Sequence, residues 1–497
     1  GWRLGTLVLG LGMAIFLVAI DTTIVSTAIP SISQEFGSVA SDGWYGSAFF
    51  LTNAVTQAPW GTIYQFTFTR LKPSFQGAMI LFEAGSLICA LAHNPATLTV
   101  GRAVAGIGAA GVSSGAYTIL AVTAPPHWRS VLTAVFGISY AVASFVGPLI
   151  GGVLTSSVTW RWCFWINLPI GGVTMATVAV VWQQTPSPPS AAATTSWKTI
   201  GKLIDLPGIV LLTGSLTCYL LALEWGGVTK PWNDQAVIGT LVGSGMLGLL
   251  FIAQQWQAGA NAAILPFPLF QRYSRMALHC GVIFFLAAAF FILLYNFPLY
   301  FQAVRGRSAT SSGIRTVPLV LGCGLFSALS GVYMSLRFGV GWIPLLLGGL
   351  LTTAGTGALW TLSPSTPVAT WAGLQVLVGA GVGVACQIPI ILNQAVADPA
   401  HLSSVTAVTL FFQLLGGCIF LQLAQCLLTN QVATHLLQGA RKVDLTAVLE
   451  AGAAGLARRF DGDTLPIVIE AYMLGIKATV LLATVLAGLA TILAALT

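Results

Sequence analysis

One acidic residue, Asp21, lies inside the first long apolar run of the sequence, Leu4 to Pro30. A carboxylate at the centre of a bilayer costs about 2.5 to 3.5 kcal/mol on insertion scales, so membrane helices keep one mainly for transport chemistry. Hydroxyl groups follow it at Thr22 and Thr23, and they can hydrogen-bond to a neighbouring helix or to their own backbone. We therefore expect Asp21 to carry a proton or pair with a cation. The alternative is an acid that a neighbouring helix satisfies for packing alone.

Two further charged residues interrupt apolar runs. Arg102 lies near the start of the run at 98 to 122, and Asp21 lies about 25 Å along its own helix at 1.5 Å per residue, so both are expected at similar depth. An Arg and an Asp at matching depth can neutralise each other, and such a pair can act as a proton switch or as a static ion pair. Glu83, in the run at 74 to 92, is a second candidate for proton coupling, and a structural role is the alternative.

The composition defines the class of protein. Of the 497 residues, 56% are hydrophobic and only 7% are charged, and the mean hydropathy is +0.87. Soluble domains carry nearer 25% charged residues, so we predict a polytopic membrane protein in a lipid bilayer. The net charge of +7 comes from basic residues scattered between apolar runs, which argues against nucleic-acid binding. The chain begins at Gly1 without a methionine or a signal-peptide pattern, and we expect terminal tails beyond these ends.

About fourteen runs are long enough to cross a hydrocarbon core of about 30 Å. We predict spans at 4–29, 44–67, 74–92, 98–122, 130–154, 163–182, 204–224, 235–254, 277–302, 313–336, 341–361, 371–394, 404–429 and 467–496. With both termini cytosolic, nine basic residues fall inside and five fall in short outside loops, which the positive-inside rule favours. The inside set is Arg3, Arg70, Lys72, Arg129, Lys198, Lys202, Arg272, Arg275 and Arg337, and the outside set is Arg161, Lys230, Arg305, Arg307 and Arg315.

Linkers divide these helices into blocks. The Pro- and Ser-rich segment 185–202 is predicted to be a cytosolic linker after a six-helix bundle at 1–184. Two additional helices at 203–256 precede a second six-helix bundle at 257–497, which contains a long outside loop at about 431–466. The halves partly repeat, because the glycine-rich run at 106–111 resembles the run at 379–383 about 273 residues later. The fold class is therefore all-α, with paired bundles of the kind found in secondary transporters.

The fifth run contains a dense set of small residues that suits close helix packing around a local bend. It comprises Gly137, Ala143, Gly147, Pro148, Gly151 and Gly152. Together with VAIDTTIVSTAIP, GRAVAGIGAAG and WRWCFWINLPIGG, this run resembles fungal members of the major facilitator superfamily, most closely the fourteen-helix drug:proton antiporters. The resemblance implies that Gly147–Gly152 is an antiporter motif and that Asp21 and Arg102 couple protons. One departure is that Gln65 replaces the acid expected after the second helix, so gating must depend on other contacts.

No phosphate-binding loop and no metal-ligand spacing is present, so a gradient is the expected energy source, with no cofactor, no metal and no enzymatic activity. Candidate substrate-binding residues are the amides and aromatics of the apolar runs: Asn53, Gln57, Tyr64, Phe284, Tyr295, Asn296, Gln387, Asn393, Phe412 and Gln413. Such a set suits amphipathic organic compounds, although interhelical hydrogen bonding is the alternative for each amide. We expect a monomeric, proton-coupled exporter of drugs, toxins or secondary metabolites in the plasma membrane or vacuolar membrane. The alternatives are an importer of a nutrient or iron chelate, a non-transporting membrane sensor and a membrane-embedded enzyme.

Overall fold

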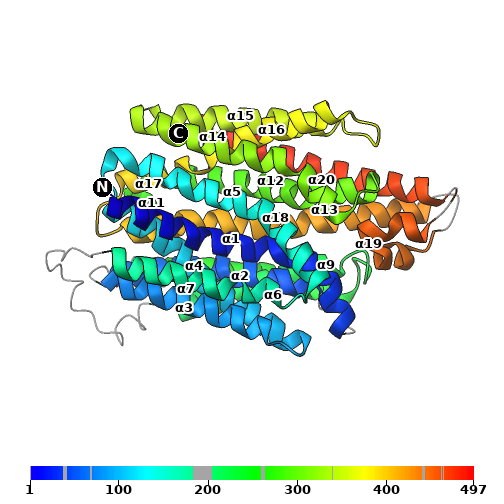
Figure 1. Ribbon diagram of the computed structural model, residues 1–497, viewed down its shortest axis with the longest axis horizontal. Helices are drawn as coiled ribbons and strands as arrows, with labels where there is room; N and C mark the ends of the chain where they lie inside the picture. Colours follow the sequence, from blue (N-terminus) through cyan, green and yellow to red (C-terminus); the bar gives the residue numbers. More distant parts are fainter. Residues whose placement is uncertain are drawn as a thin grey trace.

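The computed structural model describes residues 2–36, 42–67, 70–182, 204–258, 263–337, 340–438, 443–460, 462 and 464–497, and these residues are almost entirely helical (Figure 1). The predicted linker at 185–202 lies outside them. The first half contains α1 (Trp2–Phe36), α2 (Asp42–Phe66), α3 (Leu71–Ala90), α4 (Pro95–Thr123), α5 (Pro126–Ser157), α6 (Trp162–Trp165) and α7 (Asn167–Val181). Two further helices follow, α9 (Leu206–Trp225) and α10 (Gln235–Ala258).

The second half begins with the short α11 (Phe267–Arg272) and the long α12 (Met276–Leu299), which continues into the π-helical turn η3 (Tyr300–Val304). It continues through α13 (Ala309–Arg315), α14 (Val317–Leu336), α15 (Trp342–Leu359), α16 (Val368–Cys386), α17 (Ile388–Val396), α18 (Leu402–Gln438), α19 (Leu445–Arg459) and α20 (Thr464–Ala495). The start of α1 and the finish of α20 lie at the same end of the molecule, which we call the terminal end (Figure 1).

Twelve helical segments of the described chain are long and apolar enough to span a membrane. The helices α2 and α3 are also long enough but carry more polar residues, and with them the number agrees with the fourteen predicted spans. The prediction of a long loop at 431–466 was wrong in detail. There α18 extends to Gln438, α19 occupies Leu445–Arg459 and α20 begins at Thr464. Of the charged residues in this segment, Glu450, Arg458 and Arg459 belong to α19.

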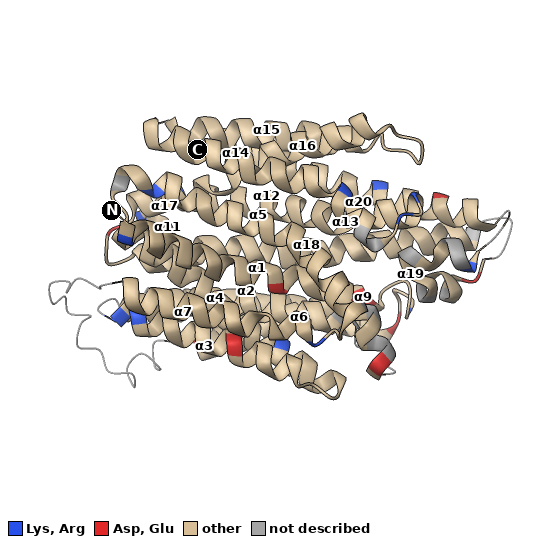
Figure 2. Cartoon of the chain, viewed as in Figure 1, with Lys and Arg blue, Asp and Glu red and all other residues tan. Residues whose placement is uncertain are grey.

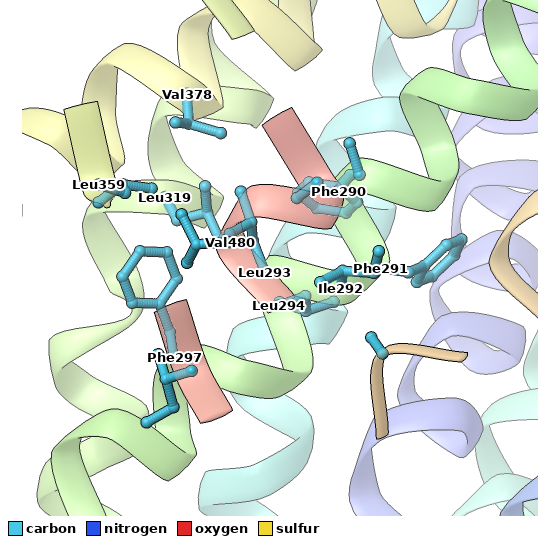
Figure 3. Close-up of a cluster of buried hydrophobic side chains, with 14 of the residues drawn as sticks. Phe290, Phe291, Ile292, Leu293, Leu294, Phe297, Leu319, Leu359, Val378 and Val480 are labelled. Carbon is cyan, nitrogen blue, oxygen red and sulfur yellow. The ribbon is translucent and has the colours of Figure 1, made fainter. Parts of the chain in front are cut away.

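Each half has its own apolar core. In the first half, α1 packs on α5 and α7, α3 packs on α4, and α2 packs on α4. In the second half, α12 packs on α18 and α20, while α14, α15 and α16 form a layer beside them. Figure 3 shows Phe290, Leu293 and Phe297 of α12 pointing toward side chains of α14, α16 and α20, including Leu319, Val378 and Val480. Across the halves, the main contacts are α2 with α18 and α5 with α14.

The repeated glycine pattern has the same packing role in both halves. A Cβ atom at Gly106 of α4 would meet backbone of α2, and one at Gly108 would meet backbone of α3. In the second half, a Cβ atom at Gly379 of α16 would meet backbone of α14, and one at Gly381 would meet backbone of α15. Each glycine pair therefore lets one helix approach two neighbours closely, at positions 273 residues apart.

The helices α9 and α10 cover one side of the contact between the halves. Leu212 and Leu216 of α9 join an apolar cluster with Leu51 and Val55 of α2 and Phe411 of α18. At the terminal end of this pair, the Asp205 side chain caps the first turn of α9. Asp205 accepts hydrogen bonds from Gly208 N at 2.9 Å, Gln254 Nε2 at 2.7 Å and Gln255 Nε2 at 2.5 Å. The apolar cluster therefore holds α9 against both halves, and the Asp205 hydrogen bonds join α9 to α10.

Candidate functional site

Asp21 and Arg102 form an ion pair in the interior of the first half. The Arg102 Nη1 atom contacts Asp21 Oδ2, and the two side chains are 1% and 0% exposed. Arg102 also donates through Nη2 to the Asp21 carbonyl at 3.3 Å and through Nε to the Tyr45 carbonyl at 2.9 Å. The structure therefore brings together the two charges that the sequence predicted at matching depth. Because water is excluded, each charge depends on the other for stabilisation.

Aromatic rings enclose the cation of this pair. The Arg102 guanidinium carbon lies 4.4 Å from the ring centroid of Phe49 and 5.8 Å from that of Phe164. A desolvated guanidinium over aromatic faces gains an electrostatic attraction of about 2 kcal/mol or more. Figure 2 shows that charged residues are few along the middle of the helices and more frequent toward the two ends. A buried pair of this kind is therefore exceptional within this molecule.

Asn167 is a third member of the site that the sequence analysis did not single out. Its Nδ2 atom donates to Asp21 Oδ1 at 3.0 Å and to Ser86 Oγ at 3.1 Å, and its side chain is fully buried. Asn167 is the first residue of α7, directly after the break that separates α6 from α7. The available signal was an amide inside an apolar run, at the centre of the motif WINLP. Its position leaves both oxygens of Asp21 in contact with a donor.

Glu83 lies close to this network without joining it by a hydrogen bond. It is three residues before Ser86 on α3, and a Cβ atom placed at Gly171 of α7 would meet its carboxyl group. Neither carboxyl oxygen of Glu83 has a hydrogen-bond partner among the described residues, although both are buried. The α3–α7 interface thus holds a second acid near the Asp21–Asn167–Ser86 chain of contacts.

The glycine-rich run of α5 contacts α1 through two of its glycines. Gly147 contacts α1 beside Asp21, because a Cβ atom there would lie 3.1 Å from Thr23 Cβ and 3.3 Å from Ile24 N. Gly151 contacts α1 one turn further along, at Thr27 and Ile24. By contrast, a Cβ atom at Gly152 would have nothing within 4 Å.

The other members of this run have separate positions. Pro148 lies within α5, where it removes one internal hydrogen bond. Gly137 faces the second half, where a Cβ atom would lie 2.6 Å from Ser327 Oγ and 3.3 Å from Gln387 Nε2. The predicted motif therefore divides into a contact with α1, a proline within the helix, and a contact between the halves.

The predicted substrate residues are not gathered in one place. In the first half, Gln57 Nε2 donates to Ser114 Oγ at 2.8 Å, Tyr64 OH donates to the Gly111 carbonyl at 2.8 Å, and Asn53 is buried on the same helix. Gln57 and Tyr64 thus join α2 to α4, as the packing alternative predicts.

In the second half, Asn296 Nδ2 donates to the carbonyl of Ile292 in the same helix, and Asn393 bonds to His279 at 2.6 Å. Phe284 and Phe412 stack edge to face at 6.4 Å, and Gln413 Nε2 lies 3.7 Å from Cys386 Sγ. These contacts lie within the second half, so they do not by themselves place the residues beside Asp21.

Two predicted residues do reach across the halves. Tyr295 OH of α12 donates to the Thr22 carbonyl of α1 at 3.3 Å, directly beside Asp21. Gln387 Oε1 accepts a hydrogen bond from Tyr117 OH of α4 at 3.1 Å. Around Tyr295, the rings of Phe50 and Tyr140 from the first half lie 6.0 and 6.4 Å from the ring of Phe291. We call Phe50, Tyr140, Phe291 and Tyr295 the interface aromatics; sequence reasoning missed the first three because only tertiary contacts distinguish them from other core rings.

At the terminal end, the two halves are in direct contact. Ser404 Oγ donates to Gln65 Oε1 at 2.6 Å, so the amide that replaces the expected acid still joins α2 to the start of α18. Gly61 approaches Ser403 and Ala407 so closely that a Cβ atom would overlap them. Across the other seam, Ser335 Oγ of α14 donates to the His127 carbonyl of α5 at 2.5 Å. The molecule is therefore held closed at this end by neutral hydrogen bonds and close backbone packing.

Comparison with known proteins identifies the family. The profile of the Major Facilitator Superfamily matches residues 11–421. The chain belongs to that superfamily. Among curated relatives, the transporter is 40% identical over 496 residues to the MFS-type transporter GME11371 of Pestalotiopsis microspora, covering 99% of this chain and 89% of the relative. It is 37% identical to the probable efflux pump gsfJ of Penicillium aethiopicum, covering 99% of this chain and 87% of the relative.

A third relative carries a substrate in its name. The transporter is 37% identical to the aspyridones efflux protein of Neocamarosporium betae, covering 98% of this chain and 86% of that protein. Among solved structures, the human organic anion transporter MFSD10 aligns with a TM-score of 0.57, at 15% identity, over 97% of this chain and 99% of the other. At that identity the structural likeness shows the fold alone, and it confirms the predicted major facilitator fold for this transporter.

Proposed function

We propose that this transporter exports amphipathic organic compounds in exchange for protons. The observation that carries the proposal is the buried Asp21–Arg102 pair, one residue away from the backbone carbonyl to which Tyr295 of the second half donates. A proton on Asp21 removes the charge that Arg102 neutralises, and the contact between α1 and α12 lies next to that change. The relatives named as efflux pumps support the outward direction.

The proposed cycle moves residues 1–184 against residues 257–497, with α9 and α10 as additional helices. In the conformation described here, the terminal end is closed by the Gln65–Ser404 and His127–Ser335 contacts. Opening that end requires separation of two hydrogen bonds, each of which contributes about 0.5 to 1.5 kcal/mol, and of the glycine-mediated packing. We further propose that this end is cytosolic, and that the protein is a monomer in the plasma membrane or, alternatively, the vacuolar membrane.

The proposed substrate class follows from the interface aromatics. Phe50, Tyr140, Phe291 and Tyr295 come from three helices of both halves and offer large apolar faces with two phenolic hydroxyls. Aromatic faces bind planar or amphipathic compounds by burial and edge contacts, and the hydroxyls select a small number of polar groups. Gln387, which lies between Tyr117 and Gly137, is the amide that we place nearest to this region.

The test is substrate-induced proton release from the purified transporter in proteoliposomes, followed with a pH-sensitive dye and a fluorescent amphipathic substrate. We expect Asp21→Asn to abolish proton release and uphill transport while retaining substrate binding, because the amide keeps the size of the carboxyl group. The matched control is Glu470→Gln, since Glu470 is 69% exposed and lies away from the pair. Undiminished proton release from Asp21→Asn would show that Asp21 does not couple protons, and the same measurement would then be made on Glu83→Gln.

A further inference from the structure

A pocket of about 340 Å³ lies at the terminal end of the second half, outside the site built around Asp21. Its wall is formed by the residues that follow α11, the first turn of α12, the start of α15, the last turn of α17 and Thr497, which follows α20. We call it the α12–α15 pocket. Four of its lining residues, Arg275, His279, Trp342 and Asn393, bear on the ligand that it can bind.

The lining of this pocket is positively charged. It includes Arg272 and Arg275 and contains no Asp or Glu. Arg272 is neutralised by Asp398, with Nη2 and Oδ2 2.5 Å apart. Arg275 forms no ion pair among the described residues, and the first turns of α12 and α15 carry no acidic residue. An unpaired guanidinium beside the positive ends of two helix dipoles attracts an anion.

A buried histidine, His279, contributes a second polar group to the lining of the pocket. His279 is only 6% exposed, and its Nδ1 atom lies 2.6 Å from Asn393 Oδ1. Thr409 Oγ1 donates to the Val405 carbonyl at 2.8 Å and accepts from Asn393 Nδ2 at 3.0 Å. Because the amide donor is occupied in this way, Asn393 presents an acceptor to the ring, so Nδ1 carries the hydrogen. The other ring nitrogen, Nε2, has no hydrogen bond among the described residues, and the residue lines the pocket.

We propose that the α12–α15 pocket binds a phosphomonoester group. The guanidinium of Arg275 can bind two phosphate oxygens side by side. A phosphomonoester also keeps a titratable P–OH, which donates to the lone pair on Nε2 of His279. If the proton moves to the ring, Nε2 donates to the phosphate oxygen instead, and the total charge is unchanged. A sulfate ion or a phosphodiester is an anion without that proton, so it meets the Nε2 lone pair with no donor.

The phosphomonoester group has two candidate sources, the head group of a membrane lipid and a soluble phosphate. The indole of Trp342, which is 50% exposed at the rim of the pocket, is of the type found at membrane interfaces. Isothermal titration of the purified full chain in detergent distinguishes the sources. The probes are short-chain phosphatidic acid, short-chain phosphatidylglycerol, inorganic phosphate and sulfate. We expect phosphatidic acid to bind at least tenfold more tightly than phosphatidylglycerol, and inorganic phosphate more tightly than sulfate if the soluble ion is the ligand.

Three variants test the residues. We expect Arg275→Gln and His279→Gln to weaken phosphomonoester binding at least tenfold, while Arg337→Gln leaves it unchanged. Arg337 is an exposed arginine directly after α14 that does not line the pocket. Thermal melting checks whether His279→Gln is folded. If His279→Gln unfolds, binding by Arg275→Gln tests the proposal, because that substitution alters an exposed side chain. The proposal would be overturned by equal binding of the mono- and diester lipids together with equal binding of phosphate and sulfate. No binding of any phosphomonoester, or equal losses in Arg275→Gln and Arg337→Gln, would also overturn it.

Discussion

The packing of α5 against α1 offers a matched pair of substitutions within one short run. Gly147→Leu places a side chain where a Cβ atom already lies 3.1 Å from Thr23 Cβ and 3.3 Å from the backbone nitrogen of Ile24. Gly152→Leu places the same side chain where a Cβ atom has nothing within 4 Å. Both changes occur in the same helix, five residues apart, and both add the helix propensity of leucine in place of glycine.

The magnitude follows from this comparison. Replacing glycine by leucine within a helix stabilises it by somewhat under 1 kcal/mol, and this gain is common to both variants. Overpacking at a close contact typically costs about 1 to 3 kcal/mol, and only Gly147→Leu incurs it. The difference between the two variants should therefore be about 1 to 3 kcal/mol, which is a factor of about 5 to 150 in an equilibrium constant. Because the clash lies two residues from Asp21, we expect loss of transport as well as of stability.

The assay is thermal unfolding of each purified variant in detergent, followed by substrate transport in proteoliposomes at equal protein content. We expect Gly147→Leu to melt below Gly152→Leu and to transport poorly, while Gly152→Leu remains close to wild type. Gly151→Leu should resemble Gly147→Leu, because it also faces α1. Equal melting temperatures and equal transport for the substitutions at 147 and 152 would refute the assignment of this run to the α1 contact.

Two other predictions concern charged groups. Arg102→Ala leaves Asp21 buried without its counter-charge, a change that typically costs about 3 to 5 kcal/mol, so the melting temperature should fall and should recover in the Asp21→Asn, Arg102→Ala double variant. Failure of the double variant to recover would contradict this. Glu35 lies near the end of α1 opposite the terminal end, where hydrogen bonds from Arg161 and Trp160 lower its pKa below 4.5. Its stabilising contribution is therefore complete above about pH 4.5 and lost as the pH falls through the lowered pKa. The melting difference between wild type and Glu35→Gln should shrink in that range, and a difference independent of pH would refute the reasoning.

The sequence was informative wherever a residue type was unusual for its surroundings. Asp21 and Arg102 were predicted as partners because charge in hydrocarbon needs compensation, and the structure places them in contact. The amides of the apolar runs were less informative. Gln57 and Asn296 donate their side-chain hydrogen bonds within one half, whereas Gln387 reaches the other, and nothing in the local sequence separates these outcomes.

The sequence by itself determined the membrane class and the approximate positions of the spans, because hydropathy and segment length are local properties of the chain. It also determined the family, because the motifs that carry the resemblance are short runs of sequence. Only the tertiary structure decided which buried groups meet. Asn167 reaches Asp21 from the far end of the first half, and Tyr295 reaches Thr22 over 273 residues of sequence. Such contacts depend on how whole helices cross and rotate, which is set by the sum of many packing interactions. The type of one buried side chain does not reveal how the helices pack, so its partner can be identified only from the tertiary structure.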